Sequence, residues 1–194
     1  MRKLNFVILF LITFQYMQGQ EISFYEDNDE SFADVKISES LIFTCRVGGF
    51  QNKGDTVVLL HGFPETSRMW KDLIKVLVQN GYKVIAPDQR GYSNGARPSK
   101  VEDYSIENLS QDIINIVNAF EEEKFHLIGH DWGAAIGWGL SASQRDKIIS
   151  YTALSVPHTD AFGDAISNDK VQSKKSYYMY LFKIKFIPEI YFKL

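Results

Sequence analysis

A pentapeptide in the second half of the chain, residues 129–133, has residue types and a spacing that could do chemistry. It reads Gly-His-Asp-Trp-Gly, so Asp131 lies midway between Gly129 and Gly133, and it follows the apolar run 125–128. Flanking glycines let a strand and a helix pass closely around a sharp turn, and the spacing is that of a nucleophile elbow, G-x-S-x-G. The turn would hold the Asp131 carboxylate over the start of a helix, where free backbone N–H groups favour a negative charge.

An aspartate in place of the usual serine selects the reaction. A serine that attacked a saturated carbon would form an ether, whereas Asp131 would form an ester that water can cleave. The residue types therefore predict displacement at carbon followed by hydrolysis. The alternative is that Asp131 only caps the helix that starts near Trp132, which would leave the paired glycines unexplained.

A second motif follows the apolar run 57–60 and consists of His61, Gly62, Phe63 and Pro64. The continuous apolar run predicts a strand that is covered on both faces. A buried strand that runs into this turn would aim a backbone N–H at the same site from the neighbouring strand. Together the two motifs predict an anionic side chain next to a backbone donor.

With these residues the chain resembles the α/β-hydrolase superfamily, and within it the epoxide hydrolases and the haloalkane dehalogenases. The resemblance extends from Phe32 to the C-terminus and rests on residues 61–65, 85–92, 129–134 and 155–158. It implies that Asp131 is the nucleophile and that the backbone N–H groups of Phe63 and Trp132 form the oxyanion hole. It implies a cis peptide between Phe63 and Pro64, and neither a metal nor an organic cofactor.

Other residues of the matching motifs have supporting roles by the same resemblance. They shape the two turns without reacting, and they are His61, Gly62, Pro64, Gly129, His130 and Gly133. Asp88, Arg90 and Gly91 match a loop of the family, in which we expect packing and hydrogen bonding and not contact with the substrate.

The substrate class depends on Phe63. Many haloalkane dehalogenases, which the chain resembles at Trp132, have an asparagine at the position of Phe63, whose amide helps to hold the departing halide; phenylalanine cannot donate that bond. We therefore expect a small apolar epoxide, with haloalkane dehalogenation as the alternative.

The leaving oxygen of an epoxide needs an acid to protonate it, and the resemblance points to Tyr178, then Tyr177, at the start of a cap segment. The alternative for these tyrosines is packing on a helix face.

The histidines of the chain are weak candidates for the base that would activate water. His130 would emerge on the wrong side of the turn, His126 precedes a buried strand, and His158 matches a family histidine that is not the base. In the family the base is a histidine near the C-terminus, preceded by its acidic partner, and both would lie beyond Leu194. An inactive fragment and a noncatalytic binding protein of the same fold therefore stay open as alternatives.

Strands and helices alternate along the chain. The expected strands are a hairpin over residues 35–47, then 57–60, 84–86, 125–128 and 148–154. The expected helices include one with apolar residues spaced over 73–78, ended by Asn80 and Gly81, and one over 106–120. Alternation of this kind predicts an α/β fold with a mostly parallel sheet, helices on both faces and an N-terminal hairpin. The start of a helical cap would follow the sheet, and the C-terminal part of the fold would be missing. Strand 148–154 would be an exposed apolar edge.

Composition and the N-terminus limit the remaining possibilities. With 21 basic and 24 acidic residues among 194, the net charge is −3, so nucleic acid is not an expected partner. Residues 1–19 have the pattern of a secretory signal peptide, which predicts a secreted protein; membrane contact would come only from an uncleaved anchor over residues 4–17. The expected parts are a signal peptide over 1–19, an acidic solvated lead-in over 20–31, the core over 32–157 and the cap start over 158–194.

Two smaller features complete the sequence. Cys45 is the single cysteine, which excludes an internal disulfide and suits a core position. Asn108, Leu109 and Ser110 form a glycosylation sequon inside the expected helix 106–120.

Overall fold

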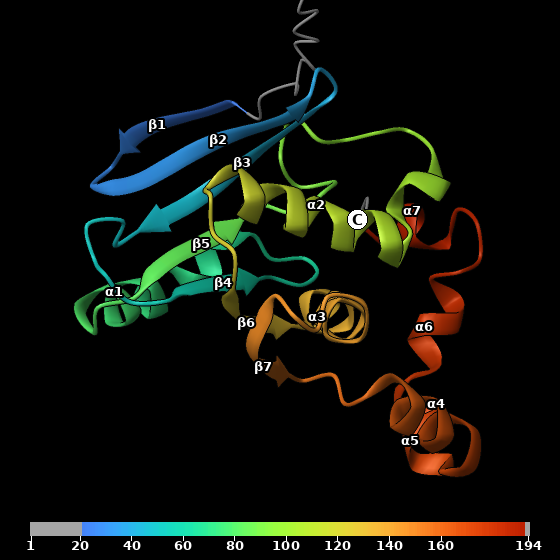
Figure 1. The fold of residues 1–194 in the computed structure, drawn as a ribbon. Coiled ribbons are helices and arrows are strands. Elements are labelled where there is room, and N and C mark those ends of the chain that lie inside the picture. The colour runs from blue at the N-terminus through green and yellow to red at the C-terminus, as the bar shows by residue number, and fades with distance from the viewer. Residues whose placement is uncertain (1–20, 193–194) are drawn as a thin grey trace, which may run out of the picture.

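The computed structural model of the protein describes residues 21–192, so the predicted signal peptide over 1–19 lies outside the described part. Seven strands form one sheet in the order β1-β2-β3-β5-β4-β6-β7 (Figure 1). They are β1 (Glu21–Asp27), β2 (Glu30–Ser38), β3 (Leu41–Gly48), β4 (Thr56–Leu60), β5 (Lys83–Pro87), β6 (Phe125–His130) and β7 (Ile148–Leu154).

The sheet has an antiparallel half and a parallel half. Strands β1, β2, β3 and β5 pair antiparallel to one another in that order. Strands β5, β4, β6 and β7 pair in parallel. The expected α/β fold and the N-terminal hairpin are confirmed, and the parallel strands are those that carry the two motifs.

The acidic segment before the hairpin, expected as a solvated lead-in, contains a strand that the sequence did not predict. Residues 21–27 form strand β1, which pairs with β2 along its whole length, from Glu21 opposite Lys36 to Asp27 opposite Glu30. The segment is largely exposed, as its charges suggested, but backbone pairing with β2 does not depend on a buried side-chain face. Phe24 also packs edge-on against the rings of Phe50 and Phe120, at centroid distances of 6.1 and 6.0 Å.

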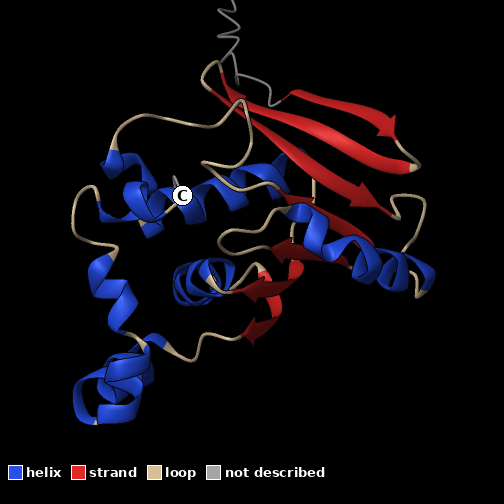
Figure 2. Cartoon of the chain, turned by 180° about the vertical axis from the view of Figure 1, so that it is seen from behind, coloured by secondary structure: helices blue, strands red, loops and turns tan. Residues whose placement is uncertain are grey.

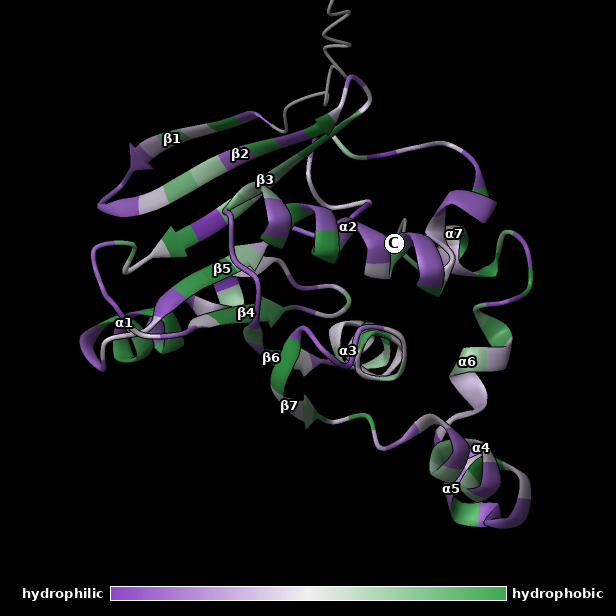
Figure 3. Ribbon diagram, viewed as in Figure 1, coloured by the Kyte–Doolittle hydropathy of each residue, from purple (hydrophilic) through white to green (hydrophobic). Residues whose placement is uncertain are grey.

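Helices cover both faces of the sheet, as Figures 1 and 2 show from opposite sides. Helix α1 (Lys71–Gln79) packs over β5 and β3, and its buried Ile74 joins a core cluster with Val57 and Val84. Helices α2 (Ile106–Ala119) and α3 (Trp132–Ser143) cover the other face, where a larger cluster of buried side chains forms the main core. The hydropathy colouring of Figure 3 is hydrophobic along β4 and β6 and hydrophilic along parts of β1.

Short helices follow the sheet. They are α4 (Thr159–Asn168), α5 (Lys170–Lys175), α6 (Tyr177–Leu181) and α7 (Ile187–Tyr191), while two 3-10 turns, Ser67–Trp70 and Val101–Tyr104, precede α1 and α2. This segment is mostly exposed, and its assignment as a cap stays a prediction. Within residues 21–192 no helix is both long and apolar enough to cross a membrane.

The register of the parallel strands brings the two motifs together. Strands β4 and β6 are neighbours, and Leu60 at the end of β4 lies opposite Gly129 near the end of β6. The turn after β4 and the turn after β6 therefore leave the sheet side by side at the same edge. Strand order thus places His61–Gly62 next to Asp131.

Candidate active site

Asp131 occupies a strained turn between β6 and α3. Its backbone dihedrals are φ 52° and ψ −116°, a conformation that residues with a side chain rarely adopt. Three backbone hydrogen bonds hold the turn: the Asp131 N–H donates to Leu154 at 3.2 Å, and the Asp131 carbonyl accepts from Ala134 and Ala135, each at 3.0 Å. The sharp turn expected from the G-x-D-x-G spacing is present.

The two glycines of the elbow are required by close backbone contacts. A Cβ on Gly129 would lie 2.4 Å from the carbonyl oxygen of Gly133, and a Cβ on Gly133 would lie 2.3 Å from the carbonyl oxygen of Leu60. Both distances are far below van der Waals contact, and both oxygens belong to the backbone, which cannot move aside without distorting the strand or the helix. The start of α3 can therefore cross β4 and β6 this closely only with glycine at both positions.

The Asp131 carboxylate faces the turn after β4. Its Oδ1 accepts a hydrogen bond from the backbone N–H of Phe63 at 3.0 Å, while the side chain makes no capping bond to helix α3. The alternative that Asp131 only caps the helix is therefore contradicted. Of the two expected amides, that of Phe63 donates to the carboxylate and that of Trp132 does not.

Gly62 makes room for this carboxylate. A Cβ at position 62 would lie 2.4 Å from Cβ and 2.6 Å from Oδ1 of Asp131. The next peptide bond, Phe63–Pro64, is cis, as the resemblance implied. Turn and carboxylate are thus in direct contact.

His61 is a buried structural residue of the same turn. Its side chain is fully buried, Nδ1 lies 2.9 Å from the Gly62 carbonyl oxygen, and Nε2 accepts the backbone N–H of Gln89 at 3.0 Å. Burial lowers the pKa of His61, so the ring is neutral and carries its hydrogen on Nδ1. Gln89 also donates its side-chain amide to the His61 carbonyl. Sequence reasoning missed this role of Gln89, because no local feature of the sequence indicates its contact with His61, which lies 28 residues earlier in the chain.

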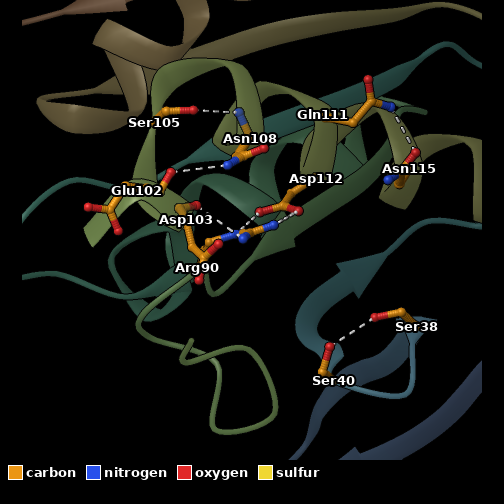
Figure 4. Close-up of polar contacts among 10 residues, drawn as sticks. All are labelled: Ser38, Ser40, Arg90, Glu102, Asp103, Ser105, Asn108, Gln111, Asp112 and Asn115. Atoms are coloured by element: carbon orange, nitrogen blue, oxygen red, sulfur yellow. Dashed lines mark hydrogen bonds and ion pairs between the residues drawn. The ribbon is translucent and has the colours of Figure 1, made fainter. Parts of the chain in front are cut away.

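The loop after β5 is held by polar contacts, as the resemblance implied for Asp88 and Arg90. Asp88 accepts the backbone N–H of Ser67 at 2.7 Å. The Arg90 guanidinium donates to both carboxylate oxygens of Asp112 on α2, at 2.7 and 2.6 Å (Figure 4). These hydrogen bonds raise the pKa of Arg90, and burial raises the pKa of Asp112 more than Arg90 lowers it.

Further acidic charge lies near Asp131. Burial raises the pKa of the Tyr92 phenol, and the negative charges of Asp131 and Glu65 raise it further. Tyr92 also packs edge-on against the His61 ring at 4.6 Å. Across residues 21–192 Asp131 takes part in no ion pair, and no cluster of three metal-ligating side chains occurs. A half-buried carboxylate with a free oxygen is what a nucleophile requires.

The histidines outside the turn contact other groups. His126 lies at the opposite end of β6, where Nδ1 is 2.7 Å from Ser150 Oγ and Nε2 is 3.5 Å from Asp55 Oδ2. His158 caps α4 by accepting the N–H of Asp160 at 3.3 Å. For His130, Nδ1 is buried without a hydrogen-bond partner in the described part of the chain. None of these contacts joins a histidine to Asp131.

The two tyrosines expected as acids lie on α6. Tyr177 and Tyr178 are 59% and 53% exposed, so neither is a core residue. The Tyr178 ring packs edge-on against Phe182 at 5.7 Å, and Phe182 in turn packs against Phe192, which contacts Phe63 at 5.1 Å. These rings link α6 to the turn after β4. No hydrogen bond among residues 21–192 joins Tyr178 to Asp131, so its role as the acid stays a prediction.

Comparison with known proteins agrees with this geometry. The family described as the alpha/beta hydrolase fold matches residues 55–180. AB hydrolase superfamily protein YfhM of Bacillus subtilis is 41% identical over 136 residues, which are 70% of this chain and 48% of that protein. Epoxide hydrolase 3 of Xenopus tropicalis is 32% identical over 160 residues, 82% of this chain and 43% of that protein.

A solved structure supports the same relationship. The crystal structure of epoxide hydrolase VrEH1 from Vigna radiata matches with a TM-score of 0.57 and 33% identity, over 73% of this chain and 41% of that one. The chain spans less than half the length of the curated relatives that it matches.

Proposed function

Because this chain belongs to the α/β-hydrolase fold family, we propose that it is part of a hydrolase that opens epoxides through a covalent ester on Asp131. The relatives described as epoxide hydrolases support the substrate class. The observation that carries the proposal is the hydrogen bond of 3.0 Å from the Phe63 N–H to Asp131 Oδ1, while within residues 21–192 the second carboxylate oxygen has no hydrogen-bond partner.

In the proposed first step Asp131 Oδ2 attacks a ring carbon of the epoxide. The new carbon–oxygen bond makes an ester, the ring carbon–oxygen bond breaks, and the released alkoxide takes a proton from Tyr178 or Tyr177. The Phe63 N–H stays on the ester carbonyl oxygen, where it would stabilise the oxyanion that forms when water attacks.

Hydrolysis of the ester needs a base, and none of the described histidines contacts Asp131. A positioned base contributes roughly 100- to 10,000-fold to such a step. The 194-residue chain tested by itself should therefore be alkylated once and release the diol slowly or not at all. This makes the proposed intermediate easier to detect.

Intact-protein mass spectrometry after incubation with a small apolar epoxide tests the proposal. We expect a mass increase equal to one whole epoxide, located at Asp131 by peptide fragmentation and lost in Asp131→Ala. Glu65→Gln, which removes a neighbouring exposed carboxylate, is the matched control and should keep the adduct. An adduct that survives Asp131→Ala, or no adduct at all, would contradict the covalent route. Epoxide bound with equal affinity by the wild type and Asp131→Ala, without an adduct, would favour a noncatalytic binding protein.

The same experiment separates the haloalkane alternative. A haloalkane would leave the alkyl group without its halogen on Asp131 and release one halide ion, whereas an epoxide adds its full mass. Phe63 offers a halide no side-chain donor, and its ring is 44% exposed beside the turn. We therefore expect the epoxide adduct to form and no halide to be released from haloalkanes.

A further inference from the structure

The single sequon of the chain, Asn108-Leu109-Ser110, lies in the first turn of helix α2 and has no part in the proposed chemistry. The Asn108 side chain is exposed, and its Nδ2 donates to the Glu102 carbonyl at 3.3 Å (Figure 4). The sequence alone placed this sequon inside a helix. The structure places its asparagine at the helix end, where a large substituent can extend into solvent.

Asn108 can be modified without loss of the helix cap. The helix N-cap is Ser105, whose Oγ accepts the backbone N–H of Asn108 at 3.3 Å and does not involve the side-chain amide. The amide nitrogen carries two hydrogens, and attachment of a sugar replaces one of them. The remaining N–H is a donor for the Glu102 carbonyl.

Ser110, the third residue of the sequon, has a hydroxyl that the fold does not use. The side chain is 8% exposed, and within residues 21–192 its Oγ has no hydrogen-bond partner. It faces a cavity of about 280 Å³ between α2 and α3, in which Gly139 is a neighbour. Within the described part of the chain no hydrogen bond depends on this hydroxyl, so alanine should fold as well at this position. The hydroxyl is therefore explained better by recognition of the unfolded sequon than by packing.

From these observations we infer that Asn108 carries an N-linked oligosaccharide. In the transfer, Asn108 Nδ2 forms a bond to the anomeric carbon of a lipid-diphosphate-linked oligosaccharide, the bond from that carbon to the phosphate oxygen breaks, and the lipid diphosphate leaves. The amide proton passes to a base of the transferase. Because Ser110 is buried in the folded protein, transfer precedes the packing of α2 on α3. The inference also requires that residues 1–19 direct the chain into the secretory pathway, as their sequence predicts.

The test is expression of the full chain, with its own N-terminus, in a eukaryotic cell line. We expect one discrete mobility shift that peptide-N-glycosidase removes, with conversion of Asn108 to aspartate in the peptide mass spectrum. Asn108→Gln and Ser110→Ala should both abolish the shift, and Ser110→Thr should keep it. Asn115→Gln, on the same helix outside the sequon, is the matched control and should also keep it.

Two further measurements distinguish the reasons for failure. Ser110→Ala should unfold at the same urea concentration as the wild type or at a higher one. If Ser110 had a structural role, Ser110→Ala would unfold at a lower urea concentration. A second chain, in which an established cleavable leader replaces residues 1–19, reports on the site alone. If neither chain carries a glycan, Asn108 is not a glycosylation site. If only the second chain carries one, the site can be modified but the natural protein is not. A mobility shift that survives Asn108→Gln shows that the glycan is attached elsewhere.

Discussion

Gly62 controls the position of the Asp131 carboxylate, because a single added methyl group would overlap it. Gly62→Ala should slow alkylation of Asp131 by about 100-fold, since a misplacement of about 1 Å at a reacting group has that effect. Time-resolved intact-protein mass spectrometry measures the rate. Gly163→Ala, at a position where a Cβ meets no atom within 4 Å, is the control and should leave the rate unchanged. A normal rate in Gly62→Ala would show that the contact between the turn and the carboxylate has no effect on the reaction.

His61 should make the fold sensitive to acid. Burial lowers the pKa of His61 below 6.5, so below pH 6.5 the unfolded chain binds a proton that the folded chain does not. The contribution to stability is complete above pH 6.5 and is lost as the pH falls toward the folded pKa, by at most about 1.4 kcal/mol per pH unit. Urea unfolding at pH 7 and pH 5 should show a steeper loss for the wild type than for His61→Gln. NMR titration should find the His61 ring neutral at pH 6; a ring that titrates at its ordinary pKa contradicts the prediction.

The sequence identifies residues that the local backbone geometry requires. It does not identify residues whose role depends on contacts with distant parts of the chain. Gly129 and Gly133 were predicted because a sharp turn requires them. Gln89 was not, since its partner His61 lies far away in the chain and local composition holds no trace of the bond. The contact of Tyr92 with His61 was missed for the same reason.

At the scale of elements, the Arg90–Asp112 pair joins the loop after β5 to helix α2. Both side chains are at least nine-tenths buried, so removal of one leaves the other charge uncompensated. Arg90→Met should lower the free energy of unfolding by about 3–5 kcal/mol, and the double variant Arg90→Met/Asp112→Leu should lower it less. Urea denaturation of both variants measures the coupling.

The exposed pair between Lys75 and Asp72 serves as the control for this cycle. Lys75 is 59% and Asp72 is 94% exposed, so Lys75→Ala should change stability by about 1 kcal/mol or less. If Arg90→Met changed stability no more than Lys75→Ala, the buried pair would not be what fastens the loop to α2.

The elements themselves were predictable where apolar patterns repeat. Runs 57–60 and 125–128 predicted β4 and β6, and the one-sided pattern of residues 106–120 predicted α2. Strand β1 escaped prediction because its residues are mostly exposed and its pairing with β2 satisfies the backbone alone. The exposed edge expected at 148–154 is confirmed as β7, which pairs in the described part of the chain with β6 only.

For the molecule as a whole, the two borders of the sheet differ in character. Strand β1 carries three acidic residues beside the exposed rings of Phe24 and Tyr25, whereas β7 has no charged residue and exposes Ile149 and Leu154 at 45% and 40%. Like charges oppose pairing at the β1 border, so two copies should associate through β7 and stop at a dimer. Light scattering across a concentration series should detect the dimer, and Ile149→Lys should weaken it. Val101→Lys, at an exposed position away from the sheet, should not; a mass unaffected by Ile149→Lys contradicts the prediction.

The division of the sheet into an antiparallel and a parallel half also sets an order of assembly in time. Strands β1, β2 and β3 pair with their neighbours in sequence, whereas β4 must find β6 across the whole of α1, β5 and α2, with Thr56 opposite Phe125. Chain closure over such a span is slow, while hairpins form quickly. We therefore expect the Asp131 carboxylate and the Phe63 N–H that donates to it to meet only after β4 has paired with β6, the pairing in the sheet that spans the longest stretch of chain. If Asp131 is the nucleophile, a nascent chain should gain reactivity toward an epoxide only late in folding.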